Sequence, residues 1–421
     1  MRIMVPYAYN VQGGVEKVTV SLLRELAELV DRVVFILPLK FHSDFMSVLP
    51  PSQKLIYETF EWPSRARTFK RKFLEMLYKN LLRIRKRFPL AIINYAIRNI
   101  ANQKIELLLN HLISQHGVTH CLYPIINDQE VPRLKVPVTG IVHDIYWHAL
   151  SSSFTKEYVS EKKKTLKEWL TKSSLIFTVS HAVKDEIIQL FPAYRHKIRA
   201  VSNAVDAANI NDKYATPSST SSDGLLIFYY PAHLTRPKNH ITLLRAILKL
   251  AQEGRKFRVI LSGTNTQFLL MKTPITYPPE AEECRLLYQE NEGLFRDHLE
   301  VLGYCNADNV SDAYRRSACV VLTSVYEGFG LPLSEALSRG LPVICSDIPP
   351  YREQVSMYQC ADRVQFFSPK DTIGLANHIR NFLMTPVKKI DPSLLKERFR
   401  HRTWRNIANE YVAALTEVGR K

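Results

Sequence analysis

The sequence lacks the features that define several special classes of protein. Among its 421 residues only 14 are glycine and 23 are proline, too few for a collagen or a low-complexity chain. Six cysteines occur without a C-x-x-C pair, and no His and Cys cluster has the spacing of a metal site. We therefore expect reduced, structural thiols, with Cys319 and Cys345 inside buried strands.

Long apolar runs are also missing. No stretch reaches the roughly 18 uninterrupted apolar residues that a membrane span requires. The segment Met1–Tyr9 is too short and too polar for the apolar region of a signal peptide. These absences predict a soluble, cytoplasmic protein.

Acidic residues are outnumbered by basic ones. The 57 Lys and Arg against 40 Asp and Glu give a formal net charge of +17, which attracts nucleic acid, anionic lipid or phosphorylated substrates. A basic nucleic-acid-binding protein is therefore one alternative. No zinc finger, RNA-recognition aromatic pair or helix-turn-helix supports it, so we expect no nucleic-acid partner.

The basic residues concentrate in residues 65–88. Between Arg65 and Arg87 there are ten basic residues and one acid, Glu75, while Phe and Leu residues recur at helical spacing. This pattern predicts a basic amphipathic helix. It either lies on an anionic membrane surface, which would make the protein peripheral to the inner face of the membrane, or packs with a solvated basic face.

Length and patterning predict two domains. Single cores stop growing near about 250–300 residues, so a chain this long divides. Short β-rich apolar runs alternate with helical ones, which indicates parallel sheets wrapped by helices. The predicted strands are 3–7, 32–37, 54–57, 119–123, 138–143, 174–179, 198–202, 225–230, 257–262, 299–303, 319–323, 342–346 and 364–367. The predicted helices include 14–29, 182–190, 241–252, 280–295, 311–317, 333–338 and 372–384.

A composition change separates the two halves. Residues 207–223 are rich in Ser, Thr, Asn and Pro, as an exposed linker would be. We therefore assign residues 1–206 and 224–402 to two Rossmann-like, doubly wound α/β domains facing each other across a cleft. Such sheets bind ligands at the carboxyl ends of their strands.

The most informative segment is Ser324–Asp347. It follows a predicted strand, turns through Glu327-Gly328-Phe329-Gly330 and enters a helix near Pro332. Free N–H groups at that helix start would suit a diphosphate, while the carboxylates of Glu327 and Glu335 would accept from sugar hydroxyls. This arrangement predicts a nucleotide-sugar site.

The same segment resembles the retaining glycosyltransferases of the GT-B fold, in particular glycosyltransferase family 4. Its signature S-x-x-E-G-F-G-L-P-x-x-E-A-x-x-x-G-x-P-V matches from Ser324 to Val343. The resemblance implies that Glu327 contacts the donor sugar, that Glu335 holds the ribose, and that the loop through Gly328, Phe329, Gly330 and Leu331 meets the diphosphate or the sugar.

Further parts of the chain resemble the same family. Lys238-Asn239 matches a G-R-x-x-x-x-K-N segment that neutralises the diphosphate, but Ala232-His233 replaces Gly-Arg, so Arg236 is the candidate for a second cation. A last helix, residues 403–421, is expected to cross back onto the first domain. The remaining candidate site residues are Gly13 and Gly14 of an N-terminal glycine loop, His143 at a strand end, Asn239, and Tyr304 for donor binding.

The resemblance implies transfer of a sugar from a GDP- or UDP-sugar to a glycan or polyprenyl-linked acceptor, with Glu327, Lys238 and His143 in catalytic roles. O-antigen or capsule synthesis is the expected setting. No D-x-D pair occurs, so we expect no metal and no cofactor. A GT-B nucleotide-sugar epimerase is the second alternative.

Overall fold

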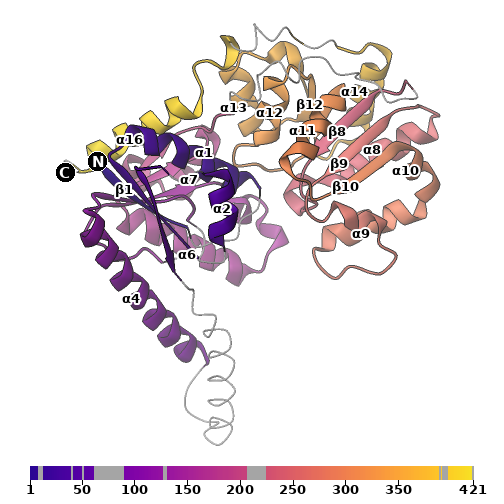
Figure 1. The fold of residues 1–421 in the computed structure, drawn as a ribbon. Coiled ribbons are helices and arrows are strands. Elements are labelled where there is room, and N and C mark those ends of the chain that lie inside the picture. The colour runs from indigo at the N-terminus through magenta and orange to yellow at the C-terminus, as the bar shows by residue number, and fades with distance from the viewer. Residues whose placement is uncertain are drawn as a thin grey trace, which may run out of the picture.

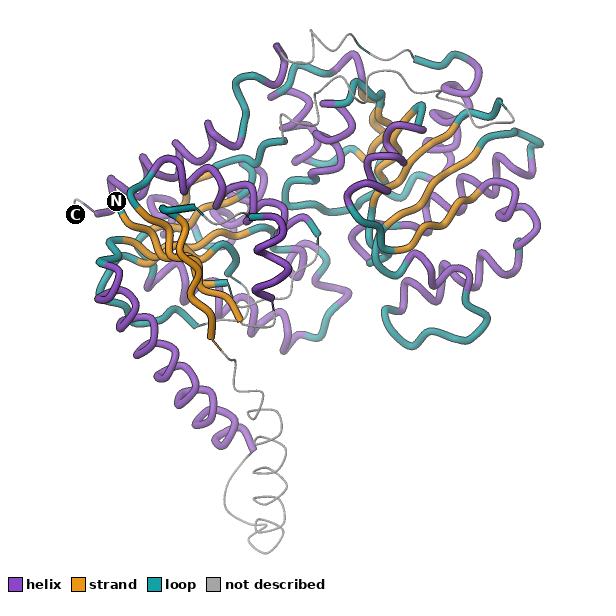
Figure 2. Tube along the Cα trace, viewed as in Figure 1, coloured by secondary structure: helices purple, strands orange, loops and turns teal. Residues whose placement is uncertain are grey.

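A computed structural model describes residues 1–7, 13–38, 41–49, 52–60, 90–126, 130–205, 224–387, 390 and 397–419, with only the backbone of residues 43, 44 and 90–101. The predicted basic helix at 65–88 and the predicted linker at 207–223 lie outside these residues. Figure 1 shows two α/β bodies that meet along one side. Each is built around its own sheet, as the tube in Figure 2 makes plain.

The first sheet has seven parallel strands in the order β3-β2-β1-β4-β5-β6-β7. They are β1 (Arg2–Pro6), β2 (Arg32–Pro38), β3 (Leu55–Phe60), β4 (His120–Tyr123), β5 (Val138–Val142), β6 (Leu175–Thr178) and β7 (Ile198–Ala200). Its helices are α1 (Gly14–Leu29), α2 (His42–Val48), α4 (Leu90–His116), α5 (Tyr146–Ala149), α6 (Lys156–Lys172) and α7 (His181–Leu190).

The second sheet has six parallel strands in the order β10-β9-β8-β11-β12-β13. They are β8 (Ile227–Pro231), β9 (Arg258–Ser262), β10 (Leu299–Gly303), β11 (Cys319–Leu322), β12 (Val343–Ser346) and β13 (Val364–Phe367). Its helices are α8 (His240–Gln252), α9 (Pro279–Glu290), α10 (Glu292–His298), α11 (Ala307–Arg316), α12 (Leu331–Ser338), α13 (Pro349–Met357) and α14 (Thr372–Met384).

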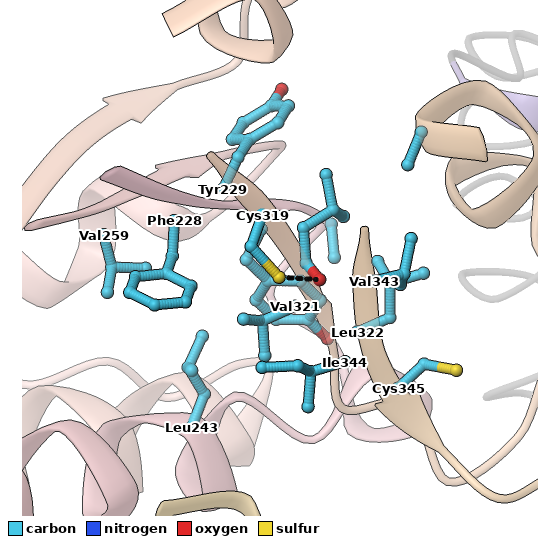
Figure 3. Packing of buried hydrophobic residues seen from close by; sticks show 14 of the residues in the cluster. Phe228, Tyr229, Leu243, Val259, Cys319, Val321, Leu322, Val343, Ile344 and Cys345 are labelled. Carbon is cyan, nitrogen blue, oxygen red and sulfur yellow. Dashed lines mark hydrogen bonds between the residues drawn. The ribbon is translucent and has the colours of Figure 1, made fainter. Parts of the chain in front are cut away.

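Continuous apolar strands account for the second core. β11 reads Cys-Val-Val-Leu and is buried throughout, as strands with helices on both faces should be. Phe228, Leu243, Val321 and Ile344 pack together between the sheet and its helices (Figure 3). All six cysteines are free, and five of them are buried, which confirms the structural thiols expected at Cys319 and Cys345.

The last described helix belongs to the first core. In α16 (Trp404–Gly419) the buried side chains of Trp404, Ile407 and Tyr411 join the apolar cluster of the first sheet. Figure 1 shows α16 in yellow beside α1, far from the second sheet that precedes it in the sequence. The C-terminal segment therefore ties the two domains together.

One predicted helix is wrong. The periodic segment 280–295 forms two helices, α9 and α10, instead of one. The break falls at Asn291, whose backbone leaves the helical region, and Gly293 follows. Asn favours caps and turns because its side chain competes for backbone hydrogen bonds, and Gly weakens a helix interior. Here the Asn291 amide donates to the Leu287 carbonyl, closing the end of α9.

Candidate active site

The strand order sets the place of the site. In each sheet the order reverses once, between β1 and β4 in the first and between β8 and β11 in the second. Doubly wound sheets bind ligands outside the carboxyl ends of the strands at such a reversal. The segments that leave these points include the turn after β8 and the loop after β11, which carry the predicted residues Lys238 and Glu327.

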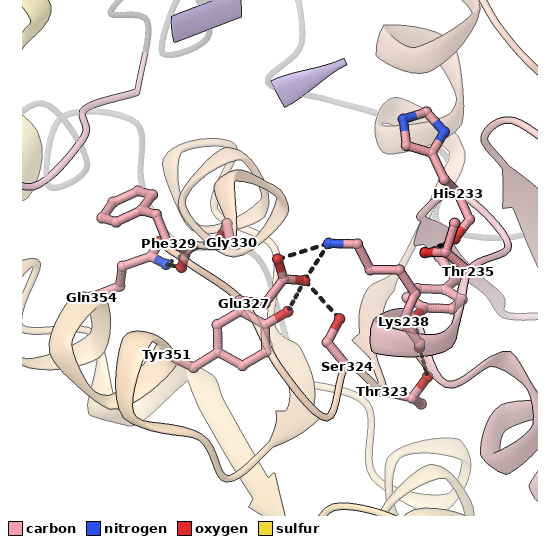
Figure 4. Close-up of polar contacts among 11 residues, drawn as sticks. His233, Thr235, Lys238, Thr323, Ser324, Glu327, Phe329, Gly330, Tyr351 and Gln354 are labelled. Carbon is pink, nitrogen blue, oxygen red and sulfur yellow. Dashed lines mark hydrogen bonds and ion pairs between the residues drawn. The ribbon is translucent and has the colours of Figure 1, made fainter. Parts of the chain in front are cut away.

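Lys238 and Glu327 form the centre of the site. The Lys238 Nζ lies 2.7 Å from each carboxylate oxygen of Glu327. The Ser324 hydroxyl donates to Glu327 Oε1 at 2.7 Å and the Tyr351 hydroxyl at 3.3 Å (Figure 4). The side chain of Glu327 is only 9% exposed and that of Lys238 is 23% exposed. The buried Ser324 and Tyr351 hold the Glu327 carboxylate in one geometry, and the carboxylate in turn holds the Lys238 ammonium.

The backbone of Lys238 is fixed by the neighbouring strand. Its carbonyl accepts hydrogen bonds from the hydroxyls of Tyr230 and Thr323. Asn239 adopts the left-handed conformation, with φ 55°, and donates from its side-chain amide to the Thr323 carbonyl at 3.1 Å. Its side-chain oxygen accepts from Thr242. Asn239 thus positions Lys238, and its predicted contact with a donor stays a prediction.

Glu335 lies across the domain boundary from α1. One carboxylate oxygen pairs with Lys17 of the first domain, and the other accepts from the Tyr314 hydroxyl at 3.0 Å. Burial alone would raise the pKa of this carboxyl, but the charges of Lys17 and Arg339 and these hydrogen bonds bring the pKa below its usual value. Glu335 is therefore ionised and ready to accept from hydroxyl groups.

The glycine loop touches both domains. Gly328 lies so close to the first domain that an added Cβ would be 1.7 Å from the His143 carbonyl oxygen. Its own carbonyl accepts from the Ser180 hydroxyl at 2.6 Å. Phe329 is buried in the core of the first sheet, Gly330 precedes α12, and Leu331 begins it. The loop thus presents the start of α12 at the domain boundary.

His143 is held as a neutral imidazole. Its Nε2 lies 2.7 Å from the Pro124 carbonyl oxygen, which can only accept, so Nε2 carries the proton and Nδ1 remains as an acceptor. Burial lowers the pKa of His143 to about 4, and the Pro124 carbonyl opposes that shift. A neutral histidine with a free acceptor nitrogen suits a sugar hydroxyl better than a phosphate.

Gly13 and Gly14 lie at the start of α1. No side chain caps that helix, and Gly13 has a φ of 108°, a conformation that favours glycine. A Cβ on Gly13 would lie 2.9 Å from His233 Nε2, and one on Gly14 would lie 3.6 Å from Leu331 Cδ1. The starts of α1 and α12 therefore approach each other, and both helix dipoles favour an anion there.

Two predicted residues lie away from this centre. Arg236 pairs with Glu280 and donates to the Ser153 hydroxyl at 2.7 Å, so its guanidinium already has partners in the structure. Tyr304 follows the edge strand β10 and is 56% exposed. Neither makes a contact that tests its predicted role in donor binding.

Several residues of the site carry no clear sequence signal. Lys17 of α1 contacts Glu335, and Tyr351 of α13 contacts Glu327. His233 faces Gly13. Glu353 of α13 accepts from the backbone N–H groups of His181 and Ala182 at the start of α7, at 3.0 and 3.1 Å. Only the position of His233, five residues before Lys238 in a matched segment, could have pointed to it.

Two further findings bear on the class of protein. Within the described residues, no group of three or more His, Cys, Asp or Glu side chains is placed to hold a metal ion. In the same part of the chain, no helix has both the length and the apolar character needed to cross a bilayer.

Comparison with solved structures identifies the fold class. A glycosyltransferase from Rickettsia africae ESF-5 matches with a TM-score of 0.67 and 16% identity, covering 99% of this chain and 98% of that one. HepE from Anabaena, solved in complex with UDP and glucose, matches with a TM-score of 0.63 and 14% identity over 99% of both chains. The fold is that of the GT-B glycosyltransferases.

Family models and curated relatives then identify the family. The model described as Glycosyltransferase Family 4 matches residues 12–209, and the model described as Glycosyl transferases group 1 matches residues 215–398. The O-antigen chain mannosyltransferase B of Escherichia coli is 30% identical over 253 residues, which cover 59% of this chain and 61% of that protein. A glycogen synthase of Mycobacterium tuberculosis is 26% identical, over 60% of this chain and 55% of its own length. The chain belongs to glycosyltransferase family 4. The match spans 61% of the length of the first of these two relatives and 55% of the second.

Proposed function

We propose that the protein is a retaining glycosyltransferase that moves a sugar from a GDP- or UDP-sugar, such as GDP-mannose, to a glycan or polyprenyl-linked acceptor. The observation that carries this proposal is the partly buried Lys238–Glu327 pair beside the converging starts of α1 and α12. The Lys238 ammonium and the two helix starts suit a diphosphate, and the Glu327 carboxylate suits sugar hydroxyls. The likeness to a mannosyltransferase of O-antigen synthesis supports the donor and the setting.

The chemistry follows from where charge develops. Cleavage of the sugar–phosphate bond leaves negative charge on the diphosphate and positive charge on the anomeric carbon. Lys238 and the N–H groups that begin α12 stabilise the first charge. Glu327 orients the sugar and Glu335 the ribose. In this proposal the departing phosphate oxygen takes the proton of the acceptor hydroxyl, which attacks from the same face, and no metal or cofactor takes part.

Donor binding requires the free site to rearrange. Lys238 and Glu327 satisfy each other in this structure, and so do Lys17 and Glu335. A bound nucleotide-sugar would bring phosphate oxygens to Lys238 and hydroxyl donors to both carboxylates. The charges are therefore already in place, and binding exchanges their partners instead of desolvating new ions.

A thermal-shift screen tests the proposal. A ligand that binds only the folded state stabilises it by about 2.7 kcal/mol at 100 times its Kd. One of GDP, UDP and their sugars should raise the melting temperature, whereas the free bases should not. If none of them raises it, the proposed donor site is wrong. A ligand whose sugar is isomerised without transfer would instead identify the epimerase alternative.

Membrane attachment through residues 65–88 belongs to the same proposal, and it rests on the sequence alone. Sedimentation with vesicles containing anionic lipid tests it. Each cation near the surface contributes up to about 1 kcal/mol, and the attraction falls with salt. Replacing Arg83, Arg85, Lys86 and Arg87 by Gln should reduce binding. Equal sedimentation of both proteins would contradict the attachment.

A further inference from the structure

Three aromatic side chains of the first domain gather beside the candidate site. The rings of Tyr146 and Phe154 meet edge to face with their centroids 5.6 Å apart, and Phe154 stacks on Tyr158 at 5.2 Å. The Lys162 ammonium lies over the Tyr158 ring, 5.3 Å from its centroid. Phe154 and Tyr158 pack against the core of the first sheet, and all three rings are half-buried. The cluster is therefore held in place but keeps part of its aromatic surface exposed.

Tyr277 of the second domain lies near this cluster. Arg236 connects the two places, because its guanidinium donates to the Ser153 hydroxyl at 2.7 Å and also pairs with Glu280 at the start of α9. Burial is the main cause that raises the pKa of Tyr146, and the charge of Tyr277 adds to it, so these two side chains are close enough to interact. Tyr277 is 82% exposed. Aromatic rings of both domains therefore flank the turn that carries Arg236.

A cavity beside these rings has a partly polar lining. Its volume is about 70 Å³, and the residues that border it include Asp144, Tyr146 and Lys162. The Asp144 carboxylate accepts from the Tyr146 backbone N–H at 3.4 Å. The Cβ of Asp144 lies 3.2 Å from the position that a Cβ on Gly328 would occupy. Asp144 therefore borders both the cavity and the loop that carries Glu327.

The chemistry of this surface indicates its ligand. The face of an aromatic ring carries partial negative charge, so it attracts C–H bonds that carry partial positive charge. Carboxylate and ammonium groups form hydrogen bonds with hydroxyls. A pyranose ring suits both, because its C–H bonds project from its faces and its hydroxyls from its edge. An acyl chain has no hydroxyl for Asp144 or Lys162, and the Asp144 carboxylate would repel a nucleic acid.

We propose that Tyr146 and Tyr277 bind the acceptor glycan by stacking on its pyranose rings. Phe154 and Tyr158 hold Tyr146 in position, and Asp144 accepts from hydroxyls of the sugar nearest the reacting centre. This assignment rests on the proposed function and names how the second substrate is held. Because the two tyrosines belong to different domains, a bound glycan contacts both domains at once.

Two substitutions of Tyr277 separate stacking from a hydrogen bond. Tyr277→Ala removes the ring, whereas Tyr277→Phe keeps the ring and removes the hydroxyl. Because this side chain is exposed, neither change should lower the melting temperature measurably. Ile373→Ala is a matched control, since it shortens a side chain on α14 in a residue that is 63% exposed. Tyr146→Leu removes the first-domain ring but keeps an apolar side chain.

The experiment measures sugar binding in the absence of a donor. The probes are methyl glycosides and α-linked disaccharides of mannose, glucose and galactose, followed by saturation-transfer NMR. We expect saturation of the aromatic protons of the protein to reach the C–H protons of at least one sugar. Tyr277→Ala and Tyr146→Leu should each raise the Kd of that sugar about 10-fold, as the loss of a stacked ring would. Tyr277→Phe and Ile373→Ala should stay within about 2-fold of the wild type.

The outcomes distinguish this assignment from the proposed function. Equal sugar binding by the wild type and Tyr277→Ala would overturn the assignment, and so would a wild type that binds UDP or GDP but none of the sugars. An equal loss in Tyr277→Phe and Tyr277→Ala would overturn stacking in favour of a hydroxyl contact. A wild type that binds a sugar through Tyr277 but neither UDP nor GDP would overturn the proposed function and not the glycan-binding surface.

Discussion

At the scale of single residues, turnover should depend on the partly buried ion pair of Lys238 and Glu327. Glu327→Gln and Lys238→Met should each lower kcat at least about 100-fold, the cost of losing one preorganised electrostatic partner. Circular dichroism should show an intact fold. Glu292→Gln is a matched control, because Glu292 pairs with Arg296 on an exposed face of α10 and should leave turnover unchanged. Turnover close to the wild type in either site variant would remove that residue from the chemistry.

Glu335 should act on affinity instead of rate. Its carboxylate is paired with Lys17 and Tyr314 at the domain boundary, away from the Lys238–Glu327 pair. Glu335→Gln should raise the Kd of the nucleotide about 10-fold, because a hydroxyl bond to a charged acceptor contributes about 1.5–3 kcal/mol. Saturating donor should restore most of the kcat. An unchanged Kd, measured by titration calorimetry, would place the ribose elsewhere.

Individual site residues were predictable where they form part of a continuous motif. Glu327, Glu335 and the glycines between them follow one another along a strand, a turn and a helix, so their spacing fixes their placement. Lys17 and Tyr351 were not predictable, because they reach the same carboxylates from α1 and α13 and nothing local marks them. Such pairs are set by tertiary packing, which a single sequence does not record.

At the scale of elements, the turn through Gly328 fixes how closely the domains approach. A Cβ at this position would lie 1.7 Å from the His143 carbonyl oxygen and 3.2 Å from Asp144 Cβ. Gly328→Ala should therefore move the loop and lower turnover by about 100-fold, since displacements near 1 Å at a reacting centre have that effect. Turnover and melting temperature are the measurements.

Gly293→Ala is the matched control for that change. Nothing lies within 4 Å of the position of its Cβ, which falls in α10. Alanine should be neutral or stabilise the helix by about 0.5–1 kcal/mol. Equal turnover in both alanine variants would show that the contact at Gly328 does not limit the active geometry.

Most elements could be predicted from apolar periodicity, and the exceptions have physical reasons. β10, β13, α1 and α14 have the predicted bounds. The two helices do so because each buries a regular apolar face. α6 was missed, since its sequence is rich in Lys and buries only Leu166, Trp169 and Leu170. Its start at Thr155, whose hydroxyl accepts from the Tyr158 N–H, is a cap that a search for helix starts would have found.

At the scale of the whole molecule, stability should depend on pH through buried histidines. Burial lowers the pKa of His240, at the start of α8, to about 3 from an ordinary value near 6.5. Below pH 6.5 His240 binds a proton in the unfolded chain but not in the folded one, so the free energy of unfolding falls as the pH falls. Above pH 6.5 His240 is neutral in both states and the free energy of unfolding does not depend on it. At pH 5 the loss from His240 is about 2 kcal/mol.

Denaturant unfolding at pH 7 and pH 5 measures this effect. His240→Gln cannot take up a proton, so its free energy of unfolding should fall less between the two values than that of the wild type. The comparison uses the difference between the two pH values, so any loss of packing in the variant cancels. An identical fall in both proteins would show that His240 is not held neutral in the fold.

The two domains are coupled by contacts that lie beside the site. Glu353 bonds to the start of α7 and to the Ser202 hydroxyl at 2.6 Å, and the Tyr326 hydroxyl donates to Glu186 at 2.7 Å. α16 adds a further connection, because it follows the second domain in the sequence and packs in the core of the first. The geometry of the site thus depends on how the two domains pack against each other.

The central claim is that this site transfers a sugar from a nucleotide-sugar with retained configuration and without a metal. The most direct measurement incubates the protein with the donor identified by thermal shift and a glycan acceptor in excess EDTA, and follows both the released diphosphonucleoside and the anomeric proton of the product by NMR. The account predicts stoichiometric release and a product with the anomeric configuration of the donor. Inverted configuration, or transfer that returns only when Mg²⁺ or Mn²⁺ is restored, would contradict it.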